Sequence, residues 1–406
     1  MISVRIYKTK RISHLVVAQF LSQIGEKMLL LGVVWQLVQT SSASIVSIAL
    51  GSAAIPHLIF FYYAGRWSKK WGFARTIMNM DIYRAVLFLA IGIVFEKSFS
   101  ESASFLIAVL FLTNIFGAFY NTSLFALPKE LIRNNDGLLQ QVTAILDSSV
   151  GLSLILGSAF SVVVYQYIGI QGLFLANGVM HLIAAALERV LTLKEAKEVS
   201  SLQPEEHAES LISLVKKSSI LKVLGSFLLM NLFLSPLIIL LPLFTKDIFH
   251  GDFKTLLKLE IALASGSLLG TLLLAVKSWR VSLFTKCLIA CSSVSILFLA
   301  FTFSTNENMA SVMLAFLGFG LAVANVAILN WFQNNSPAGS LGFSMSAVNF
   351  ILSAATPLAM IGLGQFLQHF ELQKVAQVCA VGLIISTVLM LGMIKFPSQK
   401  MELGNG

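Results

Sequence analysis

The sequence predicts an all-α integral membrane protein with about twelve transmembrane helices. Hydrophobic residues make up 57% of the chain and charged residues only 12%, and the mean hydropathy is +0.84. A soluble domain carries roughly 25% charged residues, so this chain has too few to cover a wetted surface. Its 406 residues fit about twelve spans of roughly 20 residues joined by short connections.

The apolar runs give the expected order of the helices. Each should be helical, because a backbone in lipid must satisfy its own hydrogen bonds. The basic start resembles a signal peptide, but the apolar run after it is too long and carries Glu26, so we expect a retained first helix. The runs span residues 13–39, 43–67, 76–95, 104–127, 140–166, 170–193, 219–245, 255–276, 281–303, 309–332, 342–367 and 373–395. Kinks are expected at the prolines inside them, Pro56, Pro236, Pro242 and Pro357.

One long polar stretch divides the chain. Residues 194–218 are rich in Lys, Glu and Ser, and six apolar runs lie on each side. A duplicated transporter has this layout. We therefore expect an N-terminal six-helix bundle over 1–193, a cytoplasmic linker over 194–218, and a C-terminal six-helix bundle with a short cytoplasmic tail over 219–406, the bundles being pseudo-repeats.

The basic residues predict the orientation, since cytoplasmic loops of membrane proteins are rich in Lys and Arg. If the N-terminus is inside, the cytoplasmic segments besides the linker collect Arg5, Lys8, Lys10, Arg11, Arg66, Lys69, Lys70, Arg75, Lys129, Arg133, Lys277, Arg280, Lys286, Lys395 and Lys400. The opposite side has only Lys97, Lys246, Lys254, Lys258 and Lys374. We therefore expect both termini to be cytoplasmic. We expect the protein in a cell membrane, such as a bacterial inner membrane.

Several classes of protein are disfavoured by the same sequence. The net charge of +9 does not indicate nucleic-acid binding, because the basic residues lie in short clusters between apolar runs. Enzyme signatures such as HExxH, GxSxG and a Walker sequence are missing. The cysteines Cys287, Cys291 and Cys379 all lie in apolar runs and form no CxxC motif. We expect no enzyme activity, cofactor or metal site.

Glu26 is the sharpest functional candidate, because charges inside a bilayer are costly and by default mark function. Gln19, Ser22, Gln23 and Glu26 recur at helical spacing and share one face of the first helix. That face should border protein or a water-filled cavity. The alternative to a functional role is that these residues form a buried structural hydrogen-bond network. Lys27 lies about 100° around the helix and either borders the same cavity or pairs with another helix.

Polar residues in other runs could extend a path from Glu26, or could join helices through hydrogen bonds. They are Asn114 and Asn121 in the fourth run, Asn231 and Ser235 in the seventh, Asn325 in the tenth, and Ser346, Asn349, Ser353 and Thr356 in the eleventh. Asp81 and Arg84, three residues apart, can pair along the third helix, and we expect this pair to fix the helix end against the loop that precedes it. His57 and His181 are expected to be packing residues.

These residues resemble the major facilitator superfamily, and within it the macrolide-efflux-like branch of drug:proton antiporters. Gly25 and Glu26 are similar to the Gly-acid step of that branch's first helix. In the loop between helices 2 and 3, Gly65, Gly72 and Arg75 match the superfamily's glycine- and arginine-containing signature, but Lys69 and Lys70 replace its Asp and Arg. Asp81 and Arg84 match the acid-x-x-Arg that follows. The resemblance implies a major facilitator fold.

The function implied is secondary transport by alternating access. The resemblance suggests a monomeric, proton-coupled exporter of an amphiphilic small molecule such as a drug, a macrolide or a siderophore, with Glu26 as the coupling carboxylate. The loop residues and the Asp81–Arg84 pair would take part in gating. Two alternatives stay open: a lysophospholipid flippase, which a cavity open sideways to lipid between the two halves would favour, and a non-transporting receptor or scaffold, which the altered loop signature would suit.

Overall fold

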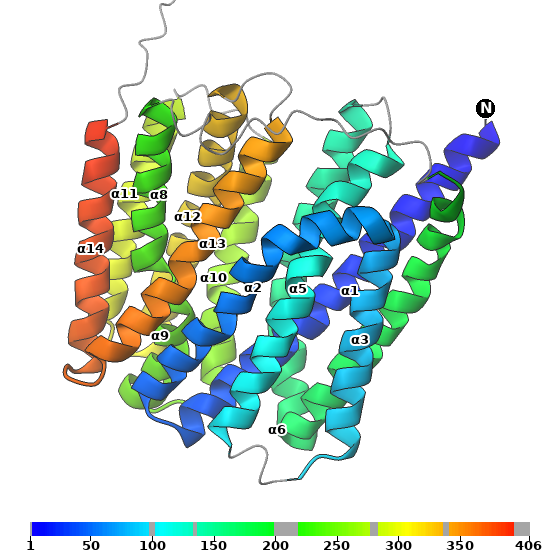
Figure 1. Cartoon of the computed structure of the whole chain (residues 1–406). Coiled ribbons are helices and arrows are strands. Elements are labelled where there is room, and N and C mark those ends of the chain that lie inside the picture. Colours follow the sequence, from blue (N-terminus) through cyan, green and yellow to red (C-terminus); the bar gives the residue numbers. More distant parts are fainter. Residues whose placement is uncertain are drawn as a thin grey trace, which may run out of the picture.

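All the regular structure that the computed structural model describes is helical. It describes residues 2–96, 102–132, 136–198, 218–276, 283–335 and 341–393. The helices run side by side in one bundle, with α2 and α13 in the middle of the view in Figure 1. Their bounds are α1 Ile2–Thr40, α2 Ala43–Trp71, α3 Phe73–Ile93, α5 Ala103–Leu131, α6 Asp136–Glu198, α8 Ser218–Leu234, α9 Leu237–Leu243, the π-helical η2 Phe244–Ile248, α10 Phe253–Val276, α11 Leu283–Thr302, α12 Glu307–Asn335, α13 Leu341–Phe366 and α14 Leu372–Met393.

These helices match the apolar runs, and the all-α membrane class is confirmed. Within the described residues, ten helices are long and apolar enough to cross a membrane. One of them, Ser149–Thr192, has 44 residues and covers two predicted spans. The predicted break between those spans falls at Gly169, whose φ of 74° and ψ of −163° interrupt the helix. The eleventh predicted run corresponds to α13, whose 26 residues include the shorter apolar segment Ala354–Phe366.

Proline shapes the seventh predicted span. Helix α8 ends before Ser235 and Pro236, and α9 begins directly after them. Pro lacks an N–H and clashes with the preceding turn, so Pro236 explains the break. Pro242 lies inside α9, just before the π-helical turn of η2. Two of the prolines expected to disturb helices therefore lie at an interruption of regular α-helix.

Small residues allow the closest helix contacts. A Cβ added at Gly266 on α10 would lie 1.8 Å from the backbone oxygen of Ala315 on α12, and one at Gly318 would lie 2.0 Å from the oxygen of Leu263. Helix α1 packs on α6 in a similar way, and there Ser161 donates a 2.8 Å hydrogen bond to the backbone oxygen of Met28. Close approach of this kind is typical of membrane helix interfaces.

The two halves of the chain, residues 2–198 and 218–393, meet along α2 and α13 and around the end of α1. Trp35 on α1 stacks on Phe253 of α10 with ring centroids 5.4 Å apart, and Tyr165 on α6 meets the same Phe253 edge-on at 5.0 Å. Lys246 donates to the backbone oxygen of Val38 at 2.5 Å. This aromatic layer lies at the end of α1 opposite the N-terminus.

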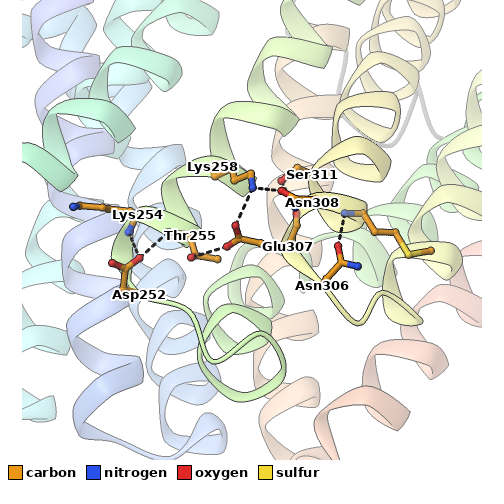
Figure 2. Close-up of polar contacts among 9 residues, drawn as sticks. Asp252, Lys254, Thr255, Lys258, Asn306, Glu307, Asn308 and Ser311 are labelled. Atoms are coloured by element: carbon orange, nitrogen blue, oxygen red, sulfur yellow. Dashed lines mark hydrogen bonds and ion pairs between the residues drawn. The ribbon is translucent and has the colours of Figure 1, made fainter.

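A polar network caps α10 and α12 near this layer (Figure 2). Asp252 Oδ1 accepts hydrogen bonds of 3.0 Å from the backbone N–H groups of Lys254 and Thr255, as an N-cap residue does. Glu307, at the start of α12, accepts hydrogen bonds from Thr255 at 2.8 Å and from Lys258 at 2.9 Å. These contacts hold the beginnings of α10 and α12 together within the second half.

Candidate functional site

A cavity of about 220 Å³ lies between the two halves. Its lining comes from α1, α2, α5 and α13, and its polar members are Glu26, Asn114, Asn121 and Thr356. The Glu26 side chain is 33% exposed. Since α13 belongs to the second half and the other three helices to the first, the cavity has walls from both halves. Its lining is completed by Ala54, Leu58 and Gly117.

Helical spacing explains how α5 presents its polar side chains. Asn114, Gly117 and Asn121 follow one another at intervals of three and four residues, so they share a face of the helix. Gly117 has no side chain, which leaves room between the two amides. On α13, Thr356 Oγ1 lies 3.4 Å from Ser235 Oγ at the end of α8. Polar residues from the fourth and eleventh predicted spans thus line the cavity with Glu26, and Ser235 of the seventh span contacts one of them.

The polar stripe of α1 divides between two environments. Gln23 and Glu26 are partly exposed, whereas Ser22 and Gln19 are buried. Ser22 donates a 2.5 Å hydrogen bond to Asp81 Oδ2 on α3. The predicted shared face is therefore turned partly toward the cavity and partly toward the interior of the first half.

A fully buried polar cluster lies behind Glu26. It contains Ser22 of α1, Asp81 and Arg84 of α3, Tyr120 of α5, and His181 and Glu188 of α6, and each is at most 1% exposed. His181 Nδ1 lies 3.0 Å from Asp81 Oδ1 and 3.4 Å from Ser22 Oγ. We name these six residues the buried cluster.

Arg84 connects the buried cluster to the cavity. Its Nη1 lies 3.5 Å from Glu26 Oε2 and 3.9 Å from Asp81 Oδ1, and its guanidinium lies over the Tyr120 ring, 5.3 Å from the centroid. No guanidinium nitrogen has a hydrogen-bond partner among the described residues. Arg84 therefore balances two carboxylates at ion-pair distance without being fixed to either by a hydrogen bond.

The structure changes one expectation about this cluster and extends another. The Asp81–Arg84 pair was expected to fix the helix end against the preceding loop, but its contacts are to α1, α5 and α6 inside the first half. His181 was expected to be a packing residue; it does pack against the Phe88 ring, with centroids 5.8 Å apart, and it also contacts Asp81 and Ser22 through Nδ1. Glu188 had not been singled out at all. The available signal was an acidic residue inside the apolar run 170–193, seven positions after His181.

The remaining predicted residues lie away from the cavity lining or outside the described side chains. Asn231 is partly buried and donates to the backbone oxygen of Phe227 at 3.1 Å, and Asn325 is exposed. The side chains of Asn349 and His57 lie outside the described part. Gly72 is the single residue between α2 and α3, with φ of 90° and ψ of 135°, while Gly65 is partly buried and Arg75 is exposed.

An apolar groove of about 260 Å³ lies on the second half, between α8, α13 and α14. Phe233, Leu358, Phe366 and Val378 are among its lining residues, and Lys374 lies among them as the charged member. Over the described residues, no three His, Cys, Asp or Glu side chains come together in a way that could hold a metal ion.

A helical membrane protein with a polar cavity between two halves has the architecture of a carrier. A Major Facilitator Superfamily model matches residues 15–360. The chain therefore belongs to the Major Facilitator Superfamily and is a membrane transporter, not an enzyme. The expected superfamily is confirmed.

Solved structures of similar fold are also transporters. A crystal structure of the nucleoside transporter NupG shares 13% identity with a TM-score of 0.76, covering 95% of this chain and 100% of that one. The POT family transporter PepTSo shares 11% identity with a TM-score of 0.74, covering 94% and 97%. An auto-inhibited POT family peptide transporter shares 11% identity with a TM-score of 0.76, covering 97% and 99%. At such identities the likeness shows the fold alone. No curated protein sequence matches the chain significantly.

Proposed function

We propose that this transporter is a proton-coupled exporter of an amphiphilic small molecule, working by alternating access. The observation that carries the proposal is the position of Glu26. It is the acidic member of the cavity lining, and it lies within 3.5 Å of a buried arginine. A carboxylate at such a position costs about 2.5–3.5 kcal/mol on insertion scales, so a role in transport explains its presence better than a role in packing.

The cavity lining suits an amphiphilic ligand. Ala54 and Leu58 offer apolar contact, while Asn114, Asn121 and Thr356 offer hydrogen bonds. Ligand pockets commonly combine an apolar wall with a few placed polar groups that set orientation. An ionised Glu26 would attract a basic group on the ligand, and a protonated Glu26 would release it. Proton binding and ligand binding at one carboxylate would then exclude each other, as an antiporter requires.

Alternating access requires contacts between the halves that can open on one side. Lys27 Nζ on α1 lies 2.9 Å from Glu260 Oε2 on α10, and the aromatic layer of Trp35, Tyr165 and Phe253 lies further along α1. Both connect the first half to the second at the end away from the N-terminus. These contacts are suited to closing the cavity on that side and separating when the halves move.

A transport screen in inverted membrane vesicles tests this function. Macrolides, siderophores and lysolipids would be offered outside the vesicles under a proton gradient, with vesicles lacking the protein as control. We expect accumulation of at least one amphiphile, and loss of that accumulation when a protonophore collapses the gradient. Accumulation that is unchanged by the protonophore would contradict proton coupling, and movement only down the ligand's own gradient would contradict active export.

The apolar groove does not favour the flippase alternative. It is formed by α8, α13 and α14, all of which belong to the second half. The flippase reading depends on a lipid-facing opening between the two halves. The lysolipid arm of the screen nevertheless separates the two functions.

A further inference from the structure

We propose that Asp81 and His181 form a second proton-binding site, and that Arg84 couples its protonation to that of Glu26. The inference rests on the proposed proton coupling and adds a buried partner to it. The side chains of Asp81 and His181 are 0% and 1% exposed, against 33% for Glu26. One nitrogen of Arg84, Nη1, lies 3.5 Å from Glu26 and 3.9 Å from Asp81, so the guanidinium adjoins both a site open to the cavity and a sealed one.

The hydrogen bonds assign the proton positions on His181. Ser22 uses its hydroxyl hydrogen to donate to Asp81 Oδ2, so toward His181 it can only accept. An ionised Asp81 also only accepts. His181 Nδ1 faces both of these acceptors and therefore carries a hydrogen. The atom that gains or loses a proton is then Nε2, and the charged imidazole would lie directly against the Asp81 carboxylate.

Several charged and titratable groups surround the Asp81–His181 pair. His181 contacts Ser22 of α1 and Asp81 of α3 through Nδ1 and packs against the Phe88 ring. The other groups lie around the same Asp81: Arg84 at 3.9 Å, and Tyr120 and Glu188 close enough to interact with it electrostatically. Neither Glu188 oxygen has a hydrogen-bond partner among the described residues. With Asp81 and Glu26 both ionised and His181 neutral, the single guanidinium of Arg84 would face two negative charges, and uncompensated buried charge is costly.

Arg84 makes the two sites dependent on each other. When His181 is protonated, it compensates Asp81 and leaves Arg84 to pair with an ionised Glu26. When Glu26 is protonated or absent, Arg84 loses that partner and is drawn toward Asp81, 3.9 Å away. The approaching guanidinium then takes over the compensation of Asp81 and repels a charged imidazole. A proton on Glu26 therefore disfavours a proton on His181, and the reverse.

For transport, this arrangement would let the protein retain a proton while Glu26 binds a cationic ligand. The buried site would keep the first half electrically balanced in both states of Glu26. When a ligand binds, the protein would then release fewer protons to solvent than it would if Glu26 were the only proton-binding site.

Nitrogen NMR of the whole protein in nanodiscs, with ¹⁵N-labelled histidine, tests the proposal without any ligand. The signal lost in His181→Asn identifies His181. We expect Nδ1 to carry a hydrogen throughout and Nε2 to gain one as the pH falls. At a fixed pH at which wild-type His181 is partly protonated, its protonated fraction should fall in Glu26→Gln and recover in Glu26→Asp, which restores a carboxylate. Asn177→Ser is the matched control, since Asn177 is a buried polar residue one turn away on the same helix.

The outcomes separate this inference from the proposed function. A His181 with its hydrogen on Nε2 alone, or one that stays neutral over the whole pH range in which the protein is folded, would overturn the buried site. An unchanged protonated fraction in Glu26→Gln would overturn the coupling through Arg84, even if that variant has lost proton-driven transport. An equal change in Asn177→Ser would also count against it, because the effect would then be one of packing.

Discussion

The ammonium of Lys27 on α1 lies 2.9 Å from Glu260 Oε2 on α10, and the two side chains are only 18% and 12% exposed. Sequence left open whether Lys27 borders the cavity of Glu26 or pairs with another helix. The structure shows that it contacts a residue of the other half. Adjacent positions on a helix differ by about 100°, so Glu26 and Lys27 can serve different contacts.

Breaking this ion pair should favour separation of the halves on that side. We expect Lys27→Gln to increase labelling of a cysteine placed at Asn121 by an impermeant thiol reagent added on the side opposite the N-terminus. Removing one partner of a buried pair costs about 3–5 kcal/mol and exposed pairs contribute about 0–1 kcal/mol, so this partly buried pair should contribute about 1–3 kcal/mol. The exchanged pair, Lys27→Glu with Glu260→Lys, should restore low labelling.

Lys258→Gln provides the matched control. The Lys258–Glu307 pair has the same 2.9 Å distance, but its side chains are 42% and 38% exposed and it lies within the second half. Lys258→Gln should therefore leave thiol labelling of the cysteine at position 121 unchanged. Equal labelling in the two variants would show that the Lys27–Glu260 pair does not close the cavity.

The glycine contact between α10 and α12 predicts a specific loss of stability. In Gly266→Ala the new methyl would overlap the backbone of Ala315, which cannot rotate away. Overpacking of this kind costs about 1–3 kcal/mol, and the thermal unfolding midpoint of the purified protein should fall. Gly362→Ala is the control, because a Cβ there meets nothing within 4 Å. A midpoint lowered as much by the control would refute the account of this contact.

The distribution of Lys and Arg predicts that both termini are cytoplasmic. A cytoplasmic reporter fused to either end should be active, and a reporter that requires export should be inactive at both. Reporters that place the two ends on opposite sides would mean an odd number of spans.

The polar composition of residues 194–218 predicts that this linker is a tether between two separately inserting halves. Cutting the chain within the linker and co-expressing the two pieces should leave part of the transport activity. Complete loss of activity, with both pieces stably inserted, would indicate that the linker does more than connect.

Sequence patterns could predict the helices and the polar face of α1, because both depend on residues close together in the chain. The break at Gly169 could be predicted in the same way, because it falls between two apolar runs that are consecutive in the chain. The pairing of Arg84 with Asp81 could be predicted from their spacing. The contacts of Arg84 with Glu26 and of Lys27 with Glu260 could not, since these partners come from other helices whose rotation is set by packing. His181 resembled a core histidine in an apolar run, and only the fold places Asp81 and Ser22 against it.

The central claim is that Glu26 couples proton movement to transport, and Glu26→Gln tests it most directly. With an amphiphile that the wild-type protein exports, two rates would be compared in vesicles: efflux driven by a proton gradient, and exchange of labelled for unlabelled ligand without a gradient. Glu371→Gln is the control, since Glu371 is 75% exposed and pairs with Lys374. We predict that Glu26→Gln lowers driven efflux by about a hundredfold or more, as expected for loss of a proton-transferring group, while exchange continues. Driven efflux at the wild-type rate would contradict the account.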